Sequence, residues 1–168
     1  IGDPAGVGPE IAVRALTDVA TYRTCRPLLI GDASVIEATL AGMGVKMPVN
    51  MVGAPSDGAF RPGQIDLFDL HNVELDQLPR AQVSAMAGKA AYEYLVHAID
   101  LAMAGEIDGI VTCPLHKDAL NQAGYHYPGH TEILADRTNT EDYAMMLVAR
   151  GLRVVLVTIH VALREALD

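Results

Sequence analysis

Short apolar runs alternate with longer helix-favouring segments over most of this chain, and this alternation constrains the fold more than any other feature. The segments with helical spacing of apolar residues cover 9–20, 34–43 and 84–105. The short apolar runs predict buried strands at 28–30, 48–52, 65–68 and 107–112. Strands that alternate with helices pair in parallel, because each helix carries the chain back to the start of the next strand. We therefore predict an α/β fold in which a mostly parallel sheet is flanked by helices.

Near the C-terminus the pattern changes to that of a hairpin. Two apolar runs rich in β-branched residues, at 143–149 and 152–159, are separated only by Arg150-Gly151, a pair typical of a tight turn. We expect an antiparallel hairpin here, which would make the sheet mixed rather than purely parallel.

Composition narrows the class of partner. The 168 residues are 51% hydrophobic and carry a formal net charge of −9, enough apolar content for a core but the wrong sign for non-specific binding to nucleic acid. No apolar stretch approaches the roughly 18 residues of a membrane span. The two cysteines have no metal-binding spacing, and we expect both to be buried free thiols. A cytoplasmic protein without a membrane or nucleic-acid partner is the expectation.

Both ends of the chain look interrupted. Residue 1 is immediately followed by a glycine-rich turn, which in an α/β protein normally follows a strand, and the last six residues resemble the beginning of a helix. We expect a fragment of a longer protein, and an intact mass of 17.9 kDa for the natural protein would contradict this.

In open α/β sheets, ligands bind beyond the carboxyl ends of the strands. The first candidate there is the turn from Gly2 to Glu10, whose glycines allow close backbone approach and whose following helix offers N–H groups to an anion. It is not a dinucleotide fingerprint, because position 11 is Ile where a third glycine is required. Asp32 has the spacing of a ribose-binding acid. A tight structural turn and a non-catalytic phosphate- or nucleotide-binding domain both remain open readings.

The second candidate is the start of a helix after Pro128-Gly129. His126 and His130 have the spacing of a helical zinc pair, but Pro128-Gly129 would break that helix, so we reject the pair. His130 and Thr131 are instead expected at a helix N-terminus, where they can bind an anionic group. Simple helix capping by Thr131 is the alternative.

Two further residues carry chemistry at predicted strand ends. His160 follows the second apolar run of the hairpin, where a neutral imidazole can bind a divalent metal or carry a proton. Lys117 follows Cys113-Pro114 and can meet a phosphate or carboxylate as a point charge. Cys113 is expected to be buried and inert, and a solvated surface position is the alternative for Lys117.

Taken together, these segments resemble the 4-hydroxythreonine-4-phosphate dehydrogenase family of pyridoxal phosphate biosynthesis. The resemblance runs over essentially the whole chain and rests on motifs in one order: Gly2-Asp3-Pro4-Ala5-Gly6-Val7-Gly8-Pro9-Glu10, Gly88-Lys89-Ala90-Ala91, Val111-Thr112-Cys113-Pro114-Leu115-His116-Lys117, Tyr127-Pro128-Gly129-His130-Thr131-Glu132 and Val157-Thr158-Ile159-His160. Many members have Ala and Asn where this chain has Cys113 and His116, and relatives that act on threonate or erythronate 4-phosphate, or on aromatic dihydrodiols, share the scaffold.

The resemblance implies a fold like that of isocitrate and isopropylmalate dehydrogenases, with residues 1–168 forming the N-terminal part of a two-domain subunit. It implies a homodimer with a shared active site, NAD as cofactor, and a divalent metal (Zn, Mg or Co). The implied reaction oxidises a secondary alcohol of a small phosphorylated substrate, and the resulting β-keto acid then loses carbon dioxide. By motif, His130 and Thr131 contact substrate, Lys117 has a substrate-side role, and His160 is one of three histidine metal ligands. The other two belong to the second half of the family's chain, so the isolated fragment is expected to lack turnover.

Overall fold

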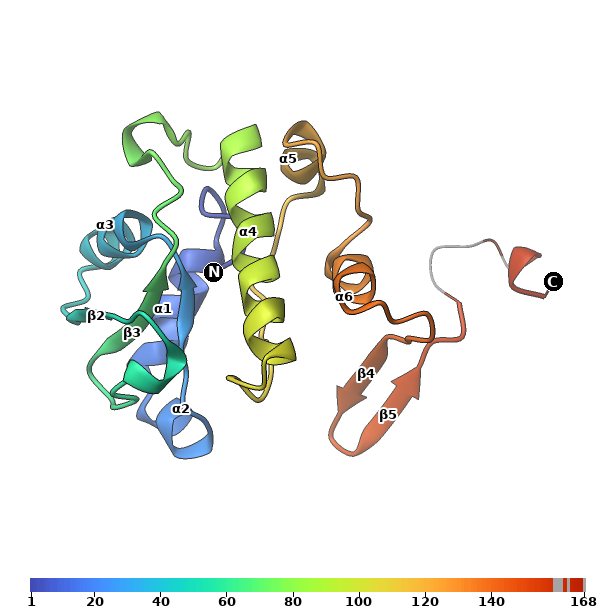
Figure 1. Cartoon of the computed structure of the whole chain (residues 1–168), viewed down its shortest axis with the longest axis horizontal. Coiled ribbons are helices and arrows are strands. Elements are labelled where there is room, and N and C mark those ends of the chain that lie inside the picture. Colours follow the sequence, from blue (N-terminus) through green and yellow to red (C-terminus); the bar gives the residue numbers. More distant parts are fainter. Residues whose placement is uncertain (159–161, 163, 168) are drawn as a thin grey trace. The chain divides into compact units, whose positions relative to one another are not determined.

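Residues 1–158, 162 and 164–167 are described by the computed structural model of the chain (Figure 1). They fall into two compact units, Ile1–Gly129 and His130–Asp168. The first unit contains a parallel sheet with helices, and the second a helix followed by a hairpin.

The sheet of the first unit has three parallel strands in the order β1-β3-β2. They are β1 (Leu29–Gly31), β2 (Val49–Met51) and β3 (Ile65–Asp69), and the pairing places Gly31 opposite Asp69. The predicted α/β class and the strands at 28–30, 48–52 and 65–68 are thereby confirmed to within one or two residues at their ends.

The first unit contains five α-helices, two of which have the cap or stop residue that the sequence predicts. They are α1 (Gly8–Thr17), α2 (Val19–Thr24), α3 (Ala33–Met43), α4 (Ala85–Met103) and α5 (Lys117–Gln122), with single 3₁₀ turns at Pro55–Asp57 and Leu75–Gln77. Ser84 accepts a hydrogen bond from the backbone of Ala87 at the start of α4, and Gly44 ends α3 in the left-handed conformation, as predicted.

The first predicted helix, 9–20, is divided in the structure. Asp18 adopts an extended conformation, and its carboxylate accepts a hydrogen bond of 2.8 Å from the backbone N–H of Ala20, which starts α2. The prediction of one continuous helix was wrong because the side chain of Asp18 caps a second helix, and this cap competes with continuation of the first helix.

The core lies where α1 and α3 meet the sheet. Apolar residues of both helices and the central strand form one buried cluster: Val13, Leu16, Ala33, Ile36, Leu40, Ile65 and Leu67. The long helix α4 packs against β1 (Figure 1). The helices thus flank the sheet and hold the carboxyl ends of its strands in fixed positions.

Helix α5 lies directly against α4 at a glycine. A Cβ added to Gly88 would lie 2.0 Å from the carbonyl oxygen of Ala119, so only glycine allows the two backbones to approach this closely. Gly88 is part of one of the family-like motifs, and its role in this structure is to seat α5 and therefore the segment that carries Lys117.

The strand predicted at 107–112 is absent among the described residues. Residues 109–116 have no regular secondary structure, and Val111 is 98% exposed. The prediction was wrong for this structure because a β-strand needs the backbone of a neighbouring strand to complete its hydrogen bonds, and residues 107–112 have no such partner among the described residues. Just beyond this range, the carbonyl of Pro114 accepts a hydrogen bond of 2.9 Å from the N–H of Asp3.

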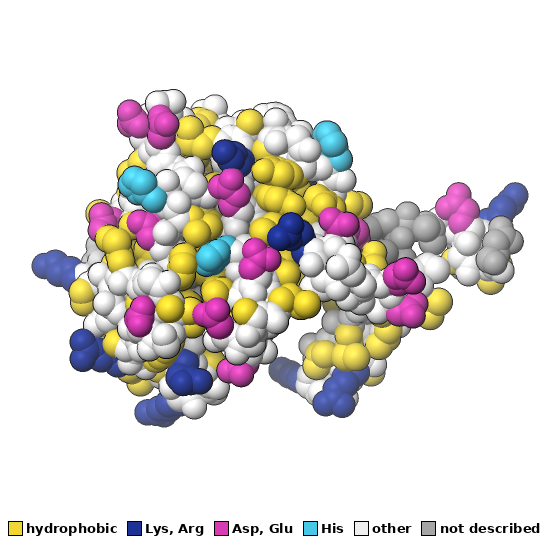
Figure 2. Space-filling model, viewed as in Figure 1, with side chains coloured by type: hydrophobic (Ala, Val, Ile, Leu, Met, Phe, Trp, Pro, Cys, Tyr) yellow, Lys and Arg dark blue, Asp and Glu magenta, His cyan; other side chains and the backbone are white. Residues whose placement is uncertain are grey.

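The second unit consists of α6 (His130–Thr138), β4 (Met146–Ala149), β5 (Leu152–Val155) and a 3₁₀ turn at Glu165–Leu167. The two strands pair antiparallel around Arg150 and Gly151, which both have positive φ, and the hairpin prediction is confirmed. The hairpin forms its own two-stranded sheet, so the prediction of one mixed sheet is corrected for the described residues. All eight strand residues are exposed, and their apolar side chains appear at the surface in Figure 2.

Within the described residues, no helix is long and apolar enough to cross a membrane.

Candidate functional site

The glycine-rich turn at the beginning of the chain is built against Cys113-Pro114. Gly2 has φ +68°, and a Cβ there would lie 2.4 Å from the carbonyl oxygen of Pro114. A Cβ at Gly8 would lie 2.2 Å from the carbonyl oxygen of Ile1. Two motifs that are far apart in the sequence are therefore one packed structure, and the glycines are needed for the approach of protein backbone.

Acidic side chains already occupy the polar positions of this turn. Asp3 is buried and accepts 2.8 Å from the N–H of Ala5. Glu10 lies in the first turn of α1, where its negative charge is favourable at the positive end of the helix, and one of its carboxylate oxygens is buried without a hydrogen-bond partner in the described structure. Because the carboxylates of Asp3 and Glu10 add negative charge here, the turn is a poor site for an anionic ligand.

Asp32 has a structural role that the ribose-binding hypothesis did not include. It is 1% exposed and caps α3: Oδ1 accepts from the N–H and hydroxyl of Ser34 at 2.9 and 2.5 Å, and Oδ2 accepts from the N–H of Val73 at 3.0 Å. A carboxylate buried in this way does not lie on a surface where a dinucleotide ribose could reach it. This geometry weakens the reading of the chain as a nucleotide-binding domain.

Lys117 is the first residue of α5 and is exposed, with His116 preceding it at the cap position. The structure leaves its ammonium group accessible to an anion.

Cys113, four residues before Lys117, is half-buried, and Cys25 is exposed. The expectation that both thiols are buried is therefore wrong, most clearly for Cys25, which lies at the end of α2, where no later element covers it.

His130 and Thr131 are the first residues of α6, as predicted. Both are half-buried, and the residue behind them on the helix, Ile133, is completely buried. The helical zinc pair is correctly rejected: His126 lies outside α6, and its Nδ1 is 3.3 Å from the side-chain oxygen of Asn121. The first turn of a helix presents N–H groups that lack intrahelical acceptors, which suits an anion such as phosphate.

His130 and Thr131 belong to the second unit and Lys117 to the first. His160, the predicted metal ligand, lies outside the described residues.

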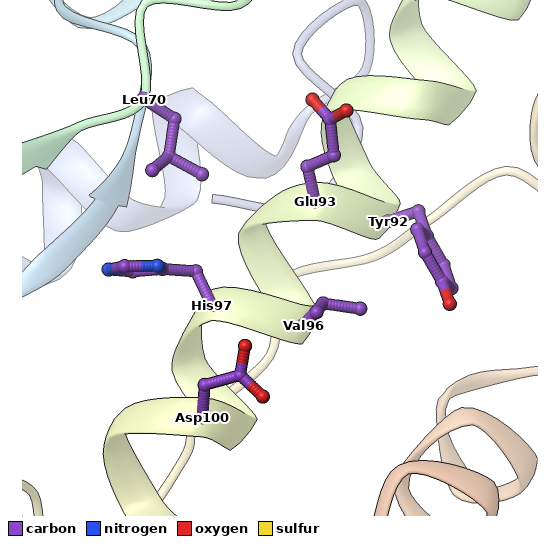
Figure 3. Close-up of a pocket in the computed structure, with 6 residues that line it drawn as sticks. All are labelled: Leu70, Tyr92, Glu93, Val96, His97 and Asp100. Atoms are coloured by element: carbon purple, nitrogen blue, oxygen red, sulfur yellow. The ribbon is translucent and has the colours of Figure 1, made fainter.

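An open groove of about 300 Å³ lies on α4 of the first unit (Figure 3). Its lining residues are Leu70, Tyr92, Glu93, Val96, His97 and Asp100. None of the predicted site residues is among them. The carboxylates of Glu93 and Asp100 would repel a phosphorylated substrate, so this groove is not the predicted substrate site.

A cluster that the sequence reasoning missed lies at the carboxyl edge of the sheet. Ligand-type atoms of Asp32, Asp69 and His71 lie within 4.8 Å of one another. Tyr94 on α4 is buried close by: burial raises the pKa of its phenol, and the negative charges of Asp32 and Asp69 raise it further. The sequence places Asp69 at the end of a predicted strand, but it does not show that this strand lies beside the one that precedes Asp32.

Comparison with known proteins agrees with this α/β architecture. The structure superimposes on a crystal structure of a 4-hydroxythreonine-4-phosphate dehydrogenase from Burkholderia phymatum with a TM-score of 0.91 and 44% sequence identity, covering 98% of this chain and 49% of that one. A second solved structure, 1.25 Å data for the Klebsiella pneumoniae enzyme of the same name, gives a TM-score of 0.89 with 36% identity, over 98% of this chain and 50% of that one. The fold is thus that of these dehydrogenases.

The chain belongs to the family described as "Pyridoxal phosphate biosynthetic protein PdxA", whose model matches residues 23–168. A Clostridium botulinum relative with the provisional name D-threonate 4-phosphate dehydrogenase is 47% identical over all of this chain and 50% of its own length. A 4-hydroxythreonine-4-phosphate dehydrogenase from Desulfosudis oleivorans is 44% identical over 98% of this chain and 48% of its own. The resemblance seen in the motifs is confirmed, and the chain spans about half the length of the curated relatives it matches.

Proposed function

We propose that this chain forms the N-terminal part of a dehydrogenase that oxidises the secondary alcohol of a four-carbon hydroxy acid 4-phosphate with NAD. The first candidate substrate is 4-hydroxythreonine 4-phosphate, which after decarboxylation gives 3-amino-2-oxopropyl phosphate. The observation that carries the proposal is the family match across residues 23–168, which includes the Pro128-Gly129-His130-Thr131 motif at the start of α6.

The proposed substrate contacts follow from the chemistry of these positions. The hydroxyl of Thr131 and the imidazole of His130 both stand in the first helical turn, where hydrogen-bond donors and the helix dipole favour an anionic group. Lys117 supplies a mobile positive charge at the start of α5. These groups bind and orient the phosphate or carboxylate of the substrate, and we assign none of them a proton-transfer step.

His160 is proposed as a ligand of the divalent metal. An imidazole suits zinc or cobalt, and the remaining ligands are proposed to come from the part of the family's sequence that this chain does not contain. When bound, such a metal polarises the substrate hydroxyl and stabilises the charge that develops on oxygen. No residue of the chain is assigned to NAD.

A second candidate substrate is threonate 4-phosphate. It is favoured by the names of relatives up to 47% identical to this chain, which refer to D-threonate 4-phosphate. The two candidates share the phosphate, the carboxylate and the alcohol that is oxidised, and they differ in carrying an amino or a hydroxyl group on the neighbouring carbon. The residues assigned above serve either one, so the choice depends on groups that recognise that carbon.

A homodimer with a shared active site and a cytoplasmic location complete the proposal. The exposed apolar hairpin supports the homodimer, because large exposed apolar faces are typical of surfaces covered by other protein segments. The free thiols support the cytoplasmic location, because they fit a reducing compartment.

The test is NADH formation by the full-length protein with each of the two phosphorylated acids, with and without a chelator. The variants are His130→Gln, Thr131→Val and His160→Ala, and the control is His126→Ala, which removes an exposed histidine outside the motif. Loss of one hydrogen bond to a charged phosphate lowers kcat/KM by about 10- to 100-fold.

We expect the two α6 variants to fall in that range, the control to retain activity, and His160→Ala to lose metal-dependent turnover. Higher kcat/KM with threonate 4-phosphate would select the second substrate. Turnover with neither acid, together with ligand binding that ignores chelator and His160→Ala, would replace the proposal by a non-catalytic phosphate-binding domain.

A further inference from the structure

Two neighbouring parallel strands end in carboxylates at the same edge of the sheet. The pairing of β1 with β3 places Gly31 opposite Asp69, so Asp32 and Asp69 both lie at this edge. The chain then turns back: the N–H of His71 donates 2.9 Å to Asp69 Oδ1, and His71 has φ +48°. This turn brings the ring of His71 to the two carboxylates, with one ligand atom of each of the three residues within 4.8 Å of the others.

The hydrogen bonds within this cluster leave acceptor positions open. A carboxylate has about four acceptor sites. Asp69 Oδ1 receives the N–H groups of Ala33 and His71, while no partner of its Oδ2 is recorded in the described part of the chain. Asp32 Oδ1 receives two donors, but its Oδ2 receives only the N–H of Val73. One oxygen on each carboxylate therefore keeps lone pairs for a further ligand.

A buried hydroxyl on which the charges of the cluster act has no hydrogen-bond partner among the described residues. Tyr94 lies on the side of α4 that packs toward β1 and is 3% exposed, and its hydroxyl has no hydrogen-bond partner among the described residues. The charges of Asp32 and Asp69 are the two strongest that act on this phenol. Buried hydroxyls in native proteins nearly always have a partner, so an unpartnered one beside two carboxylates points to a missing group between them.

The charge balance indicates which group is missing. Glu93 and Asp3 also act on the Tyr94 phenol, so four carboxylates contribute negative charge at this buried hydroxyl. Of these, only Glu93 forms an ion pair within the described residues, with Lys89 at 3.7 Å, so Asp32, Asp69 and Asp3 have no Lys or Arg partner there. A cation would satisfy both the excess negative charge and the open lone pairs, whereas a water molecule would satisfy only the latter.

We propose that Asp32, Asp69 and His71 form a divalent-cation site of their own, with the Tyr94 hydroxyl directed at a water bound to the ion. Two carboxylate oxygens and one imidazole suit Mn²⁺ or Zn²⁺. All four residues lie in the first unit, and His160 is not one of them. The ion would join the loop 70–73 to the start of α3 and to the sheet edge, so its role is to hold this part of the fold.

The test is Mn²⁺ binding to the full-length protein in a His160→Ala background, measured by electron paramagnetic resonance of free Mn²⁺. The background variant weakens the other proposed site, and the readout does not depend on turnover. His71→Gly removes the imidazole, and glycine adopts the positive φ of this position without strain. Asp69→Asn keeps an oxygen that can accept from Ala33 and His71 but removes the charge. His126→Ala is the matched loss of an exposed histidine outside the cluster.

We expect each cluster variant to weaken Mn²⁺ binding at least tenfold, since even loss of a group that only orients a ligand typically costs 10- to 100-fold. The control is expected to bind as the background does. Circular dichroism identifies any cluster variant that fails to fold. If one of the two does not fold, Mn²⁺ binding to the other cluster variant decides the test. Absence of Mn²⁺ binding in the background protein, or unchanged binding in a folded cluster variant, overturns the proposal and leaves a buried water at this position.

Discussion

Replacing Gly88 with alanine has two opposite effects on the stability of the fold. Gly88 lies inside α4, and alanine is more favourable than glycine in a helix interior by about 1 kcal/mol. The added Cβ, however, would lie 2.0 Å from the carbonyl oxygen of Ala119, where ordinary contacts begin at 3.4 Å. The α5 backbone would have to move by more than 1 Å, because the obstacle is main chain and cannot rotate away.

Overpacking of this kind costs roughly 1–3 kcal/mol, and a backbone obstacle places the cost at the upper end of that range. Subtracting the helix-propensity gain leaves an expected loss of about 2 kcal/mol in the free energy of unfolding. Urea denaturation followed by circular dichroism measures this loss. The same displacement moves the start of α5, so substrate binding through Lys117 is expected to weaken as well.

Gly42→Ala is the matched control. Gly42 lies in α3, is exposed, and has nothing within 4 Å of an added Cβ. The same chemical change should therefore leave stability unchanged or raise it by up to about 1 kcal/mol. If Gly88→Ala is as stable as the parent or more so, the close approach of α4 and α5 inferred here does not exist in solution.

Three further outcomes follow from local chemistry. Burial, together with nearby negative charge, raises the pKa of Tyr22 above 10, and its hydroxyl donates a hydrogen bond of 2.8 Å to the Gln64 carbonyl. This hydrogen bond should stabilise the fold fully below pH 10, and the stabilisation should be lost as the pH rises above that value. Urea midpoints between pH 9 and 11 should show the loss, and Tyr22→Phe should flatten the pH profile. Burial opposes ionisation of Asp66, but hydrogen bonds from Asn50 and from backbone N–H groups outweigh this effect and lower its pKa below 3.8. The free energy of unfolding should therefore fall as the pH drops through that value. A pH profile that is unchanged in Asp66→Asn would refute the assignment. Cys25 is exposed, so maleimide should label it in the native protein faster than it labels the half-buried Cys113. Equal labelling rates would argue against this difference in exposure.

The elements that the sequence predicted correctly are those governed by neighbouring residues. Ser84 caps α4 with its own hydroxyl, Gly44 ends α3 through its own φ, and Arg150-Gly151 turns the hairpin by adopting positive φ. Each device acts within a few residues, so it is visible in a single sequence. The family resemblance was likewise readable, and the match over residues 23–168 confirms it.

The failures involve residues whose state depends on distant partners. Apolar content alone cannot show that the run around Val111 has no strand beside it, or that Cys25 is left uncovered at the end of α2. The cluster of Asp69 and His71 with Asp32 was missed for the same reason, because strand order decides which strand ends are neighbours. The substrate and metal roles of Lys117, His130, Thr131 and His160 stay predictions until the variants are measured.

The contact between the glycine turn and Pro114 also bears on how the chain folds. The hydrogen bond from Asp3 to Pro114 joins opposite ends of the first unit, so it closes a very long loop, and closing such a loop costs entropy before any contact compensates for it. Contacts of high sequence separation slow folding and tend to form after local helices. During synthesis on the ribosome, the turn cannot reach its final shape until the segment beyond α4 has emerged. The glycines of this turn would therefore be among the last residues of this unit to become protected from hydrogen exchange, although they are made before the segment that carries Pro114.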